Sequence, residues 1–237
     1  MTHIGNALTF TLPLILAVAL HQILAGCPHK NPGKPVMGRY QVNDTRGCAC
    51  LLANMGLQLN ISFSSASLNK TVQDVVNLDP NVTMSSGSCG ADNAILRLSA
   101  NDNKTNLTFT FTVNTTSNKY HVSEISLSAA WPDMKEPFSA HNATLNHLCG
   151  TVGYSYMCRK EQTLSVVPEL AINTFEVQVQ PFNLTQDQFA TAEECQLDKD
   201  DMLIAIVVGA ALAGLVVIVL VAYLIGRRKS HSGYQTI

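Results

Sequence analysis

Two uninterrupted apolar runs divide the chain, and a longer polar segment lies between them. The first run is LTFTLPLILAVAL at Leu8–Leu20, and the second is MLIAIVVGAALAGLVVIVLVAYL at Met202–Leu224. The second run has 23 residues and no charged side chain. At about 1.5 Å per residue it gives about 35 Å of helix, enough to cross the hydrocarbon core of a bilayer. The pattern therefore predicts one transmembrane helix over residues 202–225.

The first apolar run is typical of a secretory signal. It is followed by the small residues of Leu24-Ala25-Gly26, which predicts a cleaved signal peptide over residues 1–26. A retained signal anchor is the alternative, because the segment before the run offers only His3 and no Lys or Arg. LAGC at Leu24–Cys27 also resembles a bacterial lipoprotein cleavage site, but a lipid on Cys27 would be redundant with the transmembrane helix.

The charges that flank the second run predict its orientation. Asp198-Lys199-Asp200-Asp201 precedes it, and Arg227-Arg228-Lys229 follows it. Cationic residues mark the cytoplasmic side of a membrane helix. The sequence therefore predicts a type I membrane protein with a luminal or extracellular amino-terminal part and a cytoplasmic tail over residues 226–237.

Between the two runs, apolar and polar residues alternate with the period of β-strands. The clearest cases are Leu57–Phe63, Leu107–Val113 and Phe175–Val179, whereas helical periodicity is weak. We expect an all-β luminal domain of antiparallel sheets over residues 40–198, as a sandwich or a related layered structure. Three prolines in Pro28–Gly38 predict a short extended linker over residues 27–39.

The luminal segment is rich in acceptor motifs for N-linked glycans. Asn60 and Asn106 fall on the polar phase of their strands, so a sugar there would project away from the buried face. Nine sequons in one segment indicate a heavily glycosylated ectodomain. They are at Asn43, Asn60, Asn69, Asn81, Asn103, Asn106, Asn114, Asn142 and Asn183.

The chain has seven cysteines, and all of them lie on the oxidising side of the predicted membrane helix. The pair in CAC at 48–50 and the cluster His141, His147 and Cys149 could be read as metal ligands. Neither spacing matches a C-x-x-C or H-x-x-x-H pair, so we expect disulfides and no metal. The odd count leaves at least one thiol unpaired, paired between chains or modified.

Composition adds little to this picture. Hydrophobic residues make up 46% of the chain and charged residues 14%, largely because of the two apolar runs, and the net charge is −2. The sequence has no G-x-S-x-G, H-E-x-x-H or glycine-rich phosphate loop. Ser88 in GSCG has no assignable base, and only loss of turnover on changing Ser88 or His147 would support an enzyme. We expect no enzymatic activity, no cofactor and no nucleic-acid partner.

Several separated stretches resemble one family. They are CLLANMGLQLNISF from Cys50, DPNVTMSSGSCGA at Asp79–Ala91, TVGYSYMC from Thr151, EEC from Glu193 and AALAGLVVIVLVAYLIGRRKSHSGYQTI from Ala210. Together they resemble the lysosome-associated membrane glycoproteins over Tyr40–Ile237.

This resemblance implies a luminal prism of packed antiparallel sheets with two disulfides, Cys50–Cys89 and Cys158–Cys195. Each would stabilise the domain by about 4 kcal/mol in the chain-entropy account. Cys48 and Cys149 are additional, and a third bridge between them stays open. The chain has room for one such luminal module, whereas family members with two modules exist.

The last residues form a candidate sorting signal. Tyr234-Gln235-Thr236-Ile237 fits Y-x-x-Φ, which clathrin adaptor complexes bind as an extended strand with side-chain pockets. Gly233 before it matches the lysosomal form of the signal in the resembling family. An extended tail would reach about 25 Å from Arg227 to Tyr234 at about 3.3 Å per residue.

The resemblance implies a structural glycoprotein of the lysosomal and late endosomal limiting membrane, with a minor cell-surface pool. Its glycans would shield the membrane, and it would support lysosome biogenesis, autophagy and the handling of membrane lipids, including cholesterol. The alternative is an endocytic, scavenger or adhesion receptor of the macrosialin type. Homo-oligomers are a further expectation, because Gly209 with Ala213 and Ala210 with Gly214 form small-x-x-x-small pairs.

Overall fold

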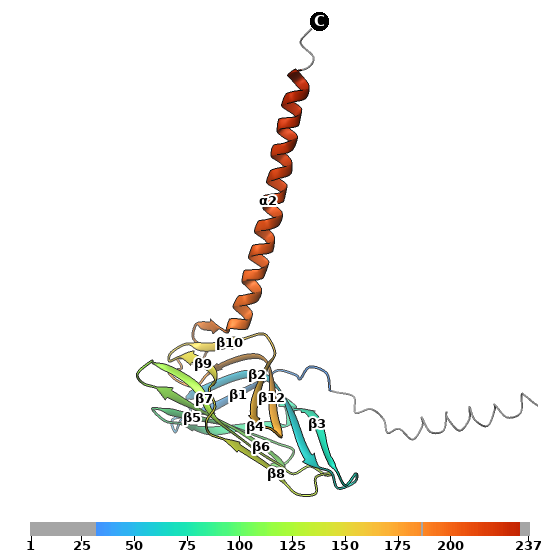
Figure 1. Cartoon of the computed structure of the whole chain (residues 1–237). Coiled ribbons are helices and arrows are strands. Elements are labelled where there is room, and N and C mark those ends of the chain that lie inside the picture. The colour runs from blue at the N-terminus through green and yellow to red at the C-terminus, as the bar shows by residue number, and fades with distance from the viewer. Residues whose placement is uncertain (1–31, 186, 233–237) are drawn as a thin grey trace, which may run out of the picture. The chain divides into compact units, whose positions relative to one another are not determined.

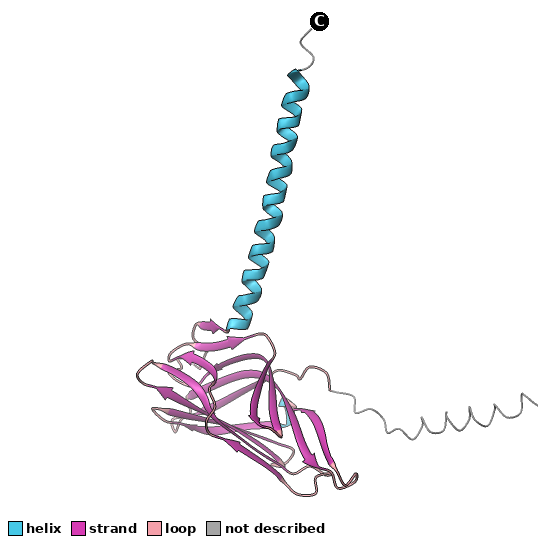
Figure 2. Cartoon of the chain, in the orientation of Figure 1, coloured by secondary structure: helices cyan, strands magenta, loops and turns pink. Residues whose placement is uncertain are grey.

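The computed structural model describes residues 32–185 and 187–232. The predicted signal peptide, Cys27 and the Gly233–Ile237 signal lie outside the described residues. The rest forms an all-β domain followed by one long helix, α2 (Figures 1 and 2). The strands are β1 (Gly38–Asn43), β2 (Ala49–Ser64), β3 (Thr71–Asn77), β4 (Thr83–Cys89), β5 (Asn93–Ala100), β6 (Thr105–Asn114), β7 (Lys119–Ala129), β8 (Phe138–Asn142), β9 (His147–Thr151), β10 (Ser155–Cys158), β11 (Gln162–Val167), β12 (Leu170–Gln180) and β13 (Ala192–Glu194); a 3-10 turn, η1, covers Pro80–Val82, and α2 covers Gln196–Ser232.

The first sheet has seven strands in the order β1-β2-β12-β10-β13, with β3 paired to β2 and β11 paired to β12. Each of its two long strands, β2 and β12, pairs along one edge with two short strands. The first part of β2 pairs with β1 and its last part with β3. In the same way β12 pairs first with β11 and then with β10. The sheet can therefore turn along its length, as a prism requires.

The second sheet has six strands in the order β4-β5-β6-β7-β8, with β9 also paired to β7. In strands β5, β6 and β7 buried residues such as Leu96, Phe109 and Ile125 alternate with half-buried or exposed neighbours, apart from one shift in β7 at Ser123 and Glu124. The inner faces of both sheets contribute to one hydrophobic core. This confirms the predicted all-β domain, with one exception in pairing: β10 and β13 are parallel.

A β-bulge corrects one part of the predicted strand pattern. The register of β12 against β2 shifts between Phe175 and Gln178, and Glu176 has a φ of +48°. The bulge moves the buried phase by one residue, so Val177 and Val179 are in the core while Phe175 is only half-buried. The expectation that Phe175 shares the face of Val177 was wrong.

One buried tyrosine joins the two sheets. Tyr120 on β7 is completely buried, and its hydroxyl accepts a hydrogen bond from the backbone N–H of Tyr156 at 2.8 Å. The hydroxyl lies 3.1 Å from the carbonyl oxygens of Tyr154 and Val179, to which it donates. A Cβ on Gly150 would lie 2.5 Å from this hydroxyl oxygen. Burial raises the pKa of Tyr120.

The predicted linker differs from the structure in its second half. Pro35 is buried over Gly56, and the Asn77 amide donates to the carbonyl oxygen of Gly33 at 2.8 Å. Lys34 forms an ion pair with Glu176. Residues 33–39 are therefore packed against the first sheet, and β1 already begins at Gly38.

The helix α2 is longer at both ends than the predicted transmembrane segment. It begins at Gln196, directly after Cys195, and continues to Ser232. Its apolar side chains from Met202 to Ile225 are exposed, as expected for a helix that contacts lipid. The reach of about 25 Å given above holds for an extended tail, whereas residues 227–232 are helical.

Candidate functional site

The nine sequon asparagines are spread over both sheets and their connections. Six are exposed, and they lie in connections or at strand ends: Asn43, Asn69, Asn81, Asn103, Asn114 and Asn183. Asn60 and Asn106 lie within strands and Asn142 ends β8, and these three are half-buried. None of the nine asparagines is buried in the core, so glycans at these positions would cover the outer surface of the domain.

The strand sequons occupy the outward phase. Asn60 lies between the buried residues Leu59 and Ile61, and Asn106 precedes the buried Leu107. The Asn60 side-chain oxygen accepts a hydrogen bond from the Gln73 amide at 2.8 Å. Both side chains therefore leave the core face, which is the orientation that the alternation predicts.

Three sequon asparagines lie in turns that need a left-handed backbone. Asn69, Asn103 and Asn183 have φ values of +52°, +65° and +53°. Asparagine tolerates this conformation better than other non-glycine residues. These asparagines, which are candidate glycan acceptors, therefore also have a local structural role.

Asn142 links the two sheets. Its side-chain nitrogen donates to the carbonyl oxygen of Val166 on β11 at 2.7 Å, and its oxygen accepts from the backbone N–H of Thr144 at 2.9 Å. The nitrogen is also the atom that would carry a glycan. A glycosylated amide keeps one N–H, so the bond to Val166 and a glycan are chemically compatible.

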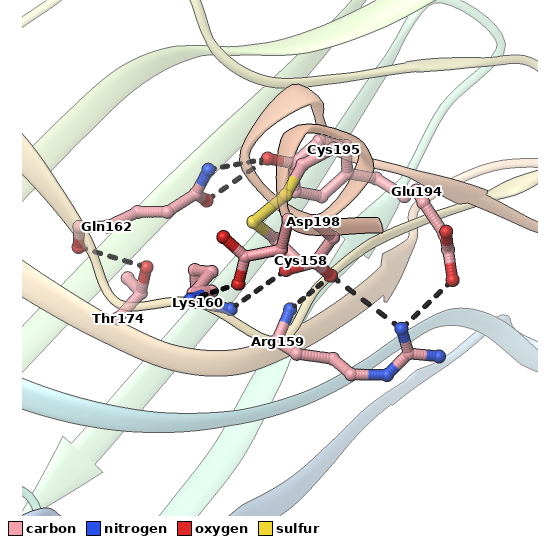
Figure 3. Close-up of a disulfide and its surroundings, with 10 residues drawn as sticks. Cys158, Arg159, Lys160, Gln162, Thr174, Glu194, Cys195 and Asp198 are labelled. Carbon is pink, nitrogen blue, oxygen red and sulfur yellow. Dashed lines mark hydrogen bonds and ion pairs between the residues drawn. A yellow bond between two sulfur atoms is a disulfide. The ribbon is translucent and has the colours of Figure 1, made fainter. Parts of the chain in front are cut away.

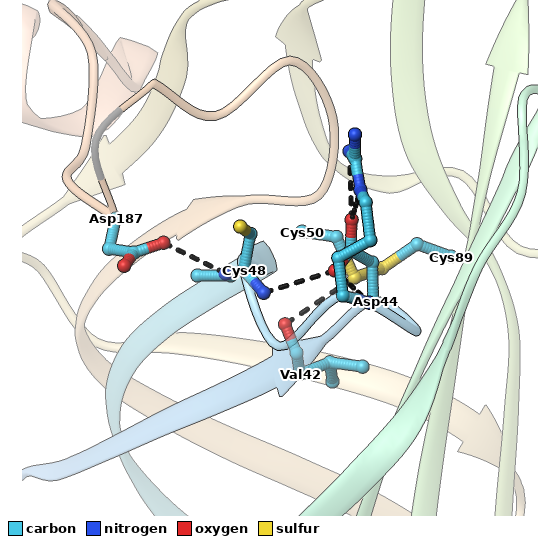
Figure 4. Close-up of polar contacts among 8 residues, drawn as sticks. Val42, Asp44, Cys48, Cys50, Cys89 and Asp187 are labelled. Atoms are coloured by element: carbon cyan, nitrogen blue, oxygen red, sulfur yellow. Dashed lines mark hydrogen bonds and ion pairs between the residues drawn. A yellow bond between two sulfur atoms is a disulfide. The ribbon is translucent and has the colours of Figure 1, made fainter.

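The disulfide Cys50–Cys89 connects the first sheet to the second. It joins β2 to the end of β4, with the two Cα atoms 6.2 Å apart. Cys48 precedes β2 as an exposed free thiol (Figure 4). Its backbone N–H donates to the Asp44 carboxylate at 3.0 Å, and this bond is the main reason that the pKa of Asp44 is lowered.

The disulfide Cys158–Cys195 connects β10 to the residue before α2, with the two Cα atoms 5.1 Å apart. Next to it, the buried carboxylate of Asp198 accepts hydrogen bonds from the backbone N–H groups of Arg159 at 2.8 Å and Lys160 at 3.2 Å (Figure 3). Because Asp198 belongs to the first turn of α2, the helix is attached to the β10–β11 loop by more than its covalent bridge.

Two ion pairs complete this attachment. The guanidinium of Arg159 contacts Glu194 on β13 at 2.9 Å, and Lys160 pairs with Asp201 on α2. We call the Cys158–Cys195 disulfide, Asp198 and these two ion pairs the α2 junction. Both pairings that the family resemblance implied, Cys50–Cys89 and Cys158–Cys195, are therefore present in the structure.

Two of the candidate metal ligands of the sequence, His141 and Cys149, are engaged in other contacts. His141 pairs with Glu124 at 2.9 Å, and the Cys149 thiol donates to Asn146 at 3.2 Å. Within residues 32–185 and 187–232, Cys158, Cys195 and Asp198 form the one cluster with metal-ligand geometry. The two sulfurs of that cluster are bonded to each other, so they offer no thiolate to a cation.

The candidate nucleophile and the candidate histidine are far apart in the second sheet. Ser88 is on β4, His147 is on β9, and strands β5, β6 and β7 lie between them. The structure therefore does not bring Ser88 and His147 together as a nucleophile and its base.

Sequence reasoning did not identify the two groups that join the large elements, Tyr120 between the sheets and Asp198 at α2. Tyr120 lies at the start of a strand and belongs to no recognisable motif. Asp198 belongs to an acidic run, which from the sequence alone is interpreted only as the flank of a membrane helix. The one sequence feature that could have indicated the role of Asp198 is its position three residues after Cys195.

Comparison with known proteins gives a consistent result. A family model described as lysosome-associated membrane glycoprotein 2-like, luminal domains, matches residues 25–196. A second model, lysosome-associated membrane glycoprotein 2, transmembrane segment, matches residues 204–235.

Individual relatives agree with these models. The chain is 46% identical to human lysosome-associated membrane glycoprotein 1 over 204 residues, which are 86% of this chain and 48% of that protein. It is 44% identical to human lysosome-associated membrane glycoprotein 2 over 202 residues, 85% of this chain and 47% of that protein. The chain thus spans about half the length of the curated relatives it matches.

Solved structures share the fold. The crystal structure of the membrane-proximal domain of mouse lysosome-associated membrane protein 1 has a TM-score of 0.64 at 38% identity, covering 69% of this chain and 99% of that one. Human lysosome-associated membrane protein 3 has a TM-score of 0.59 at 28% identity, covering 68% of this chain and 99% of that one.

Proposed function

Because this chain belongs to the lysosome-associated membrane glycoprotein family, we propose that it is a structural glycoprotein of the lysosomal and late endosomal limiting membrane, with a minor pool at the cell surface. The family membership supports a lysosomal membrane glycoprotein. The glycan shield, the sorting route and the role in lysosome biogenesis and autophagy are the proposed part.

The observation that carries the proposal is the distribution of the sequons. They lie on both sheets and in the connections between strands, and six of them are exposed. An N-linked glycan is bulky and hydrophilic, so glycans at these sites hinder a protease from reaching the backbone beneath them. A domain held by two disulfides adds resistance to unfolding, which proteolysis usually requires.

Delivery depends on the tail in this proposal. Gly233, Tyr234 and Ile237 form the signal that clathrin adaptor complexes would bind, with the tyrosine ring and the isoleucine side chain in separate pockets. These residues lie outside the described residues, and the proposal for them rests on the sequence and on family membership.

Membrane partners are a further part of the proposal. The positions of Gly209 and Gly214 on α2 have open space where a Cβ would be, so a second helix could approach closely and form a homo-oligomer. Handling of membrane lipids, including cholesterol, is supported by family membership alone.

Proteolysis of the purified protein tests the shield. The full chain is placed in lipid nanodiscs, deglycosylated enzymatically without denaturation, and digested with a lysosomal cysteine protease at acidic pH. We expect the intact protein to survive severalfold longer than the deglycosylated one. Equal thermal unfolding midpoints of the two samples show that the fold is unchanged, and equal digestion rates would contradict the shield.

Steady-state localisation tests the rest. We expect the chain to reside with lysosomal markers and a small fraction to be labelled by a cell-impermeant reagent. A predominantly surface population that internalises a ligand would instead support the receptor of the macrosialin type.

A further inference from the structure

A groove of about 890 Å³ lies where the corner between β9, β10 and β13 meets the first turn of α2. Its walls come from both sheets and from the helix, so it exists only because the α2 junction holds these elements together. The residues that matter for its chemistry are Lys119, His147, Cys149, Glu193, Glu194, Leu197 and Lys199.

The helix side of the groove is close to the start of the apolar span. Lys199 stands three residues before Met202, where the apolar span begins, so the two are about 4.5 Å apart along the axis at about 1.5 Å per residue. The headgroup region on each side of a bilayer is about 5–8 Å thick. Leu197 in the same turn is an exposed apolar side chain with 47% of its surface accessible, as suits this interface.

Among the described residues, the side chains of Lys119, His147 and Lys199 in the groove have no hydrogen bond or ion pair with the protein, whereas each of the two groove carboxylates accepts a hydrogen bond. Glu193 accepts from the backbone N–H of Thr151 at 2.8 Å, and Glu194 binds the Arg159 guanidinium at 2.9 Å. The groove therefore offers unpaired donors to an anion.

The nearby carboxylates of the first helical turn are also engaged. Asp200 accepts a hydrogen bond from the Gln196 amide at 2.7 Å, and Asp201 pairs with Lys160. Asp198 is buried under its bonds to the β10–β11 loop. These carboxylates reduce the positive potential around Lys199 but form no hydrogen bond or ion pair with its ammonium group.

The groove is free of glycan acceptors. The sequence has no sequon between Asn142 and Asn183 and none between Asn183 and the apolar span. The groove lining contains no sequon asparagine, although Asn114 is the cross-strand partner of Lys119 in the groove wall.

We propose that this groove binds the phosphate headgroup of an anionic phospholipid in the luminal leaflet. The ammonium groups of Lys119 and Lys199 approach the phosphate from the domain side and the helix side, and the His147 ring supplies a third N–H donor. Charge-assisted hydrogen bonds of this kind are the strong class of polar contact. The inference rests on membrane insertion of α2 and not on the shield or the sorting route.

Cys149 makes the groove measurable, because its free thiol lies in the groove wall while Cys48 lies in a different pocket beside Cys50–Cys89. The full chain is reconstituted in nanodiscs of phosphatidylcholine with or without phosphatidylglycerol. A water-soluble maleimide is added, and labelling of both thiols is followed by peptide mapping. We expect phosphatidylglycerol to slow labelling at Cys149 by about threefold or more, as for a site that is at least two-thirds occupied, and to leave Cys48 unchanged.

Variants separate a specific site from the general surface potential of an anionic bilayer. The double variant Lys119→Gln/Lys199→Gln should lose the slowing, whereas Arg97→Gln, which removes an exposed cation of β5 outside the groove and outside the α2 junction, should keep it. Equal labelling of Cys149 in the two lipids overturns the proposal. So does slowing that persists in the double variant or that appears equally at Cys48.

A further arm tests the source of the phosphate. Soluble glycerol phosphate is added to phosphatidylcholine nanodiscs at the concentration of phosphatidylglycerol headgroups. We expect no protection of Cys149, because the groove lies at the bilayer surface. Protection equal to that by phosphatidylglycerol would overturn the assignment to a membrane lipid.

Discussion

The backbone N–H of Arg159 donates a hydrogen bond of 2.8 Å to the buried carboxylate of Asp198. Arg159 directly follows the disulfide cysteine Cys158, and Asp198 comes three residues after its partner Cys195. The covalent bridge and this hydrogen bond therefore connect the same loop to the same helical turn. The disulfide holds the loop and the helix together, and the hydrogen bond fixes the rotation of the helix relative to the loop.

Asp198→Asn should destabilise the luminal domain. The amide has only one oxygen to accept from the two backbone N–H groups, so one of them loses its partner near the core. We expect a loss of about 1–3 kcal/mol, which lowers the unfolding midpoint by about 2–10 °C for a domain of this size. Differential scanning calorimetry of the full chain in detergent measures the midpoint.

Asp200→Asn is the matched control, because Asp200 is an exposed acidic residue of the same helical turn. It should change the free energy of unfolding by less than about 0.5 kcal/mol. A shift as large as that of Asp198→Asn would show that loss of negative charge, and not loss of the buried hydrogen bonds, is responsible.

Two buried tyrosines should respond in opposite ways to loss of the hydroxyl. Tyr120→Phe leaves the N–H of Tyr156 without its acceptor and should cost about 1–3 kcal/mol. The hydroxyl of Tyr40 is buried and has no hydrogen-bond partner in the structure, so Tyr40→Phe should be neutral or stabilise by up to about 1 kcal/mol. Thermal unfolding of the two variants compares them directly, and similar losses would contradict the assignment.

Alkaline pH should weaken the fold through Tyr40. Burial, with a smaller contribution from Asp79, raises the pKa of Tyr40 to about 12 from 10.0. Below pH 10 the phenol is neutral in the folded and unfolded states, and its stabilising contribution is complete. Between pH 10 and about 12 only the unfolded state releases the proton, so the free energy of unfolding falls as the pH rises.

Tyr40→Phe should reduce this fall, which urea unfolding at a series of pH values can follow after the free thiols have been alkylated. The fall should not vanish, because burial also raises the pKa of Tyr120. An identical pH dependence of the variant and the original chain would show that Tyr40 does not contribute.

The tail signal predicts a change in location. Tyr234→Ala removes the aromatic ring and hydroxyl that an adaptor pocket would hold, so the chain should accumulate severalfold at the cell surface. Gln235→Ala alters a spacer residue and should leave the distribution unchanged. Surface biotinylation measures both, and unchanged lysosomal delivery of Tyr234→Ala would contradict the role of the signal.

The sequence predicted strands where a single face is buried, and it missed detail where burial or register changes. Leu57, Leu59 and Ile61 alternate with polar residues because only one face of that part of β2 meets the core. Earlier in β2, Leu51 and Leu52 are both fully buried, so alternation is lost and the pattern could not show where the strand begins.

Other features depend on contacts between distant segments. The bulge at Glu176 follows from the register of β12 against β2, and the three-residue strand β13 is too short for any periodicity. The bonds of Tyr120 and Asp198 need the folded arrangement of segments 34 or more residues away. The cysteine pairing followed from family resemblance, because seven cysteines alone allow many connectivities.

The uninterrupted course of α2 through Arg227 to Ser232 limits how far the sorting peptide can stand off from the bilayer. Those five residue steps advance about 7.5 Å as helix, against about 17 Å for an extended chain. Tyr234 follows only two positions later in the sequence. In the proposed sorting role, an adaptor would therefore have to approach the cytosolic leaflet closely in order to bind Tyr234, so binding of the signal and contact with the leaflet would occur together.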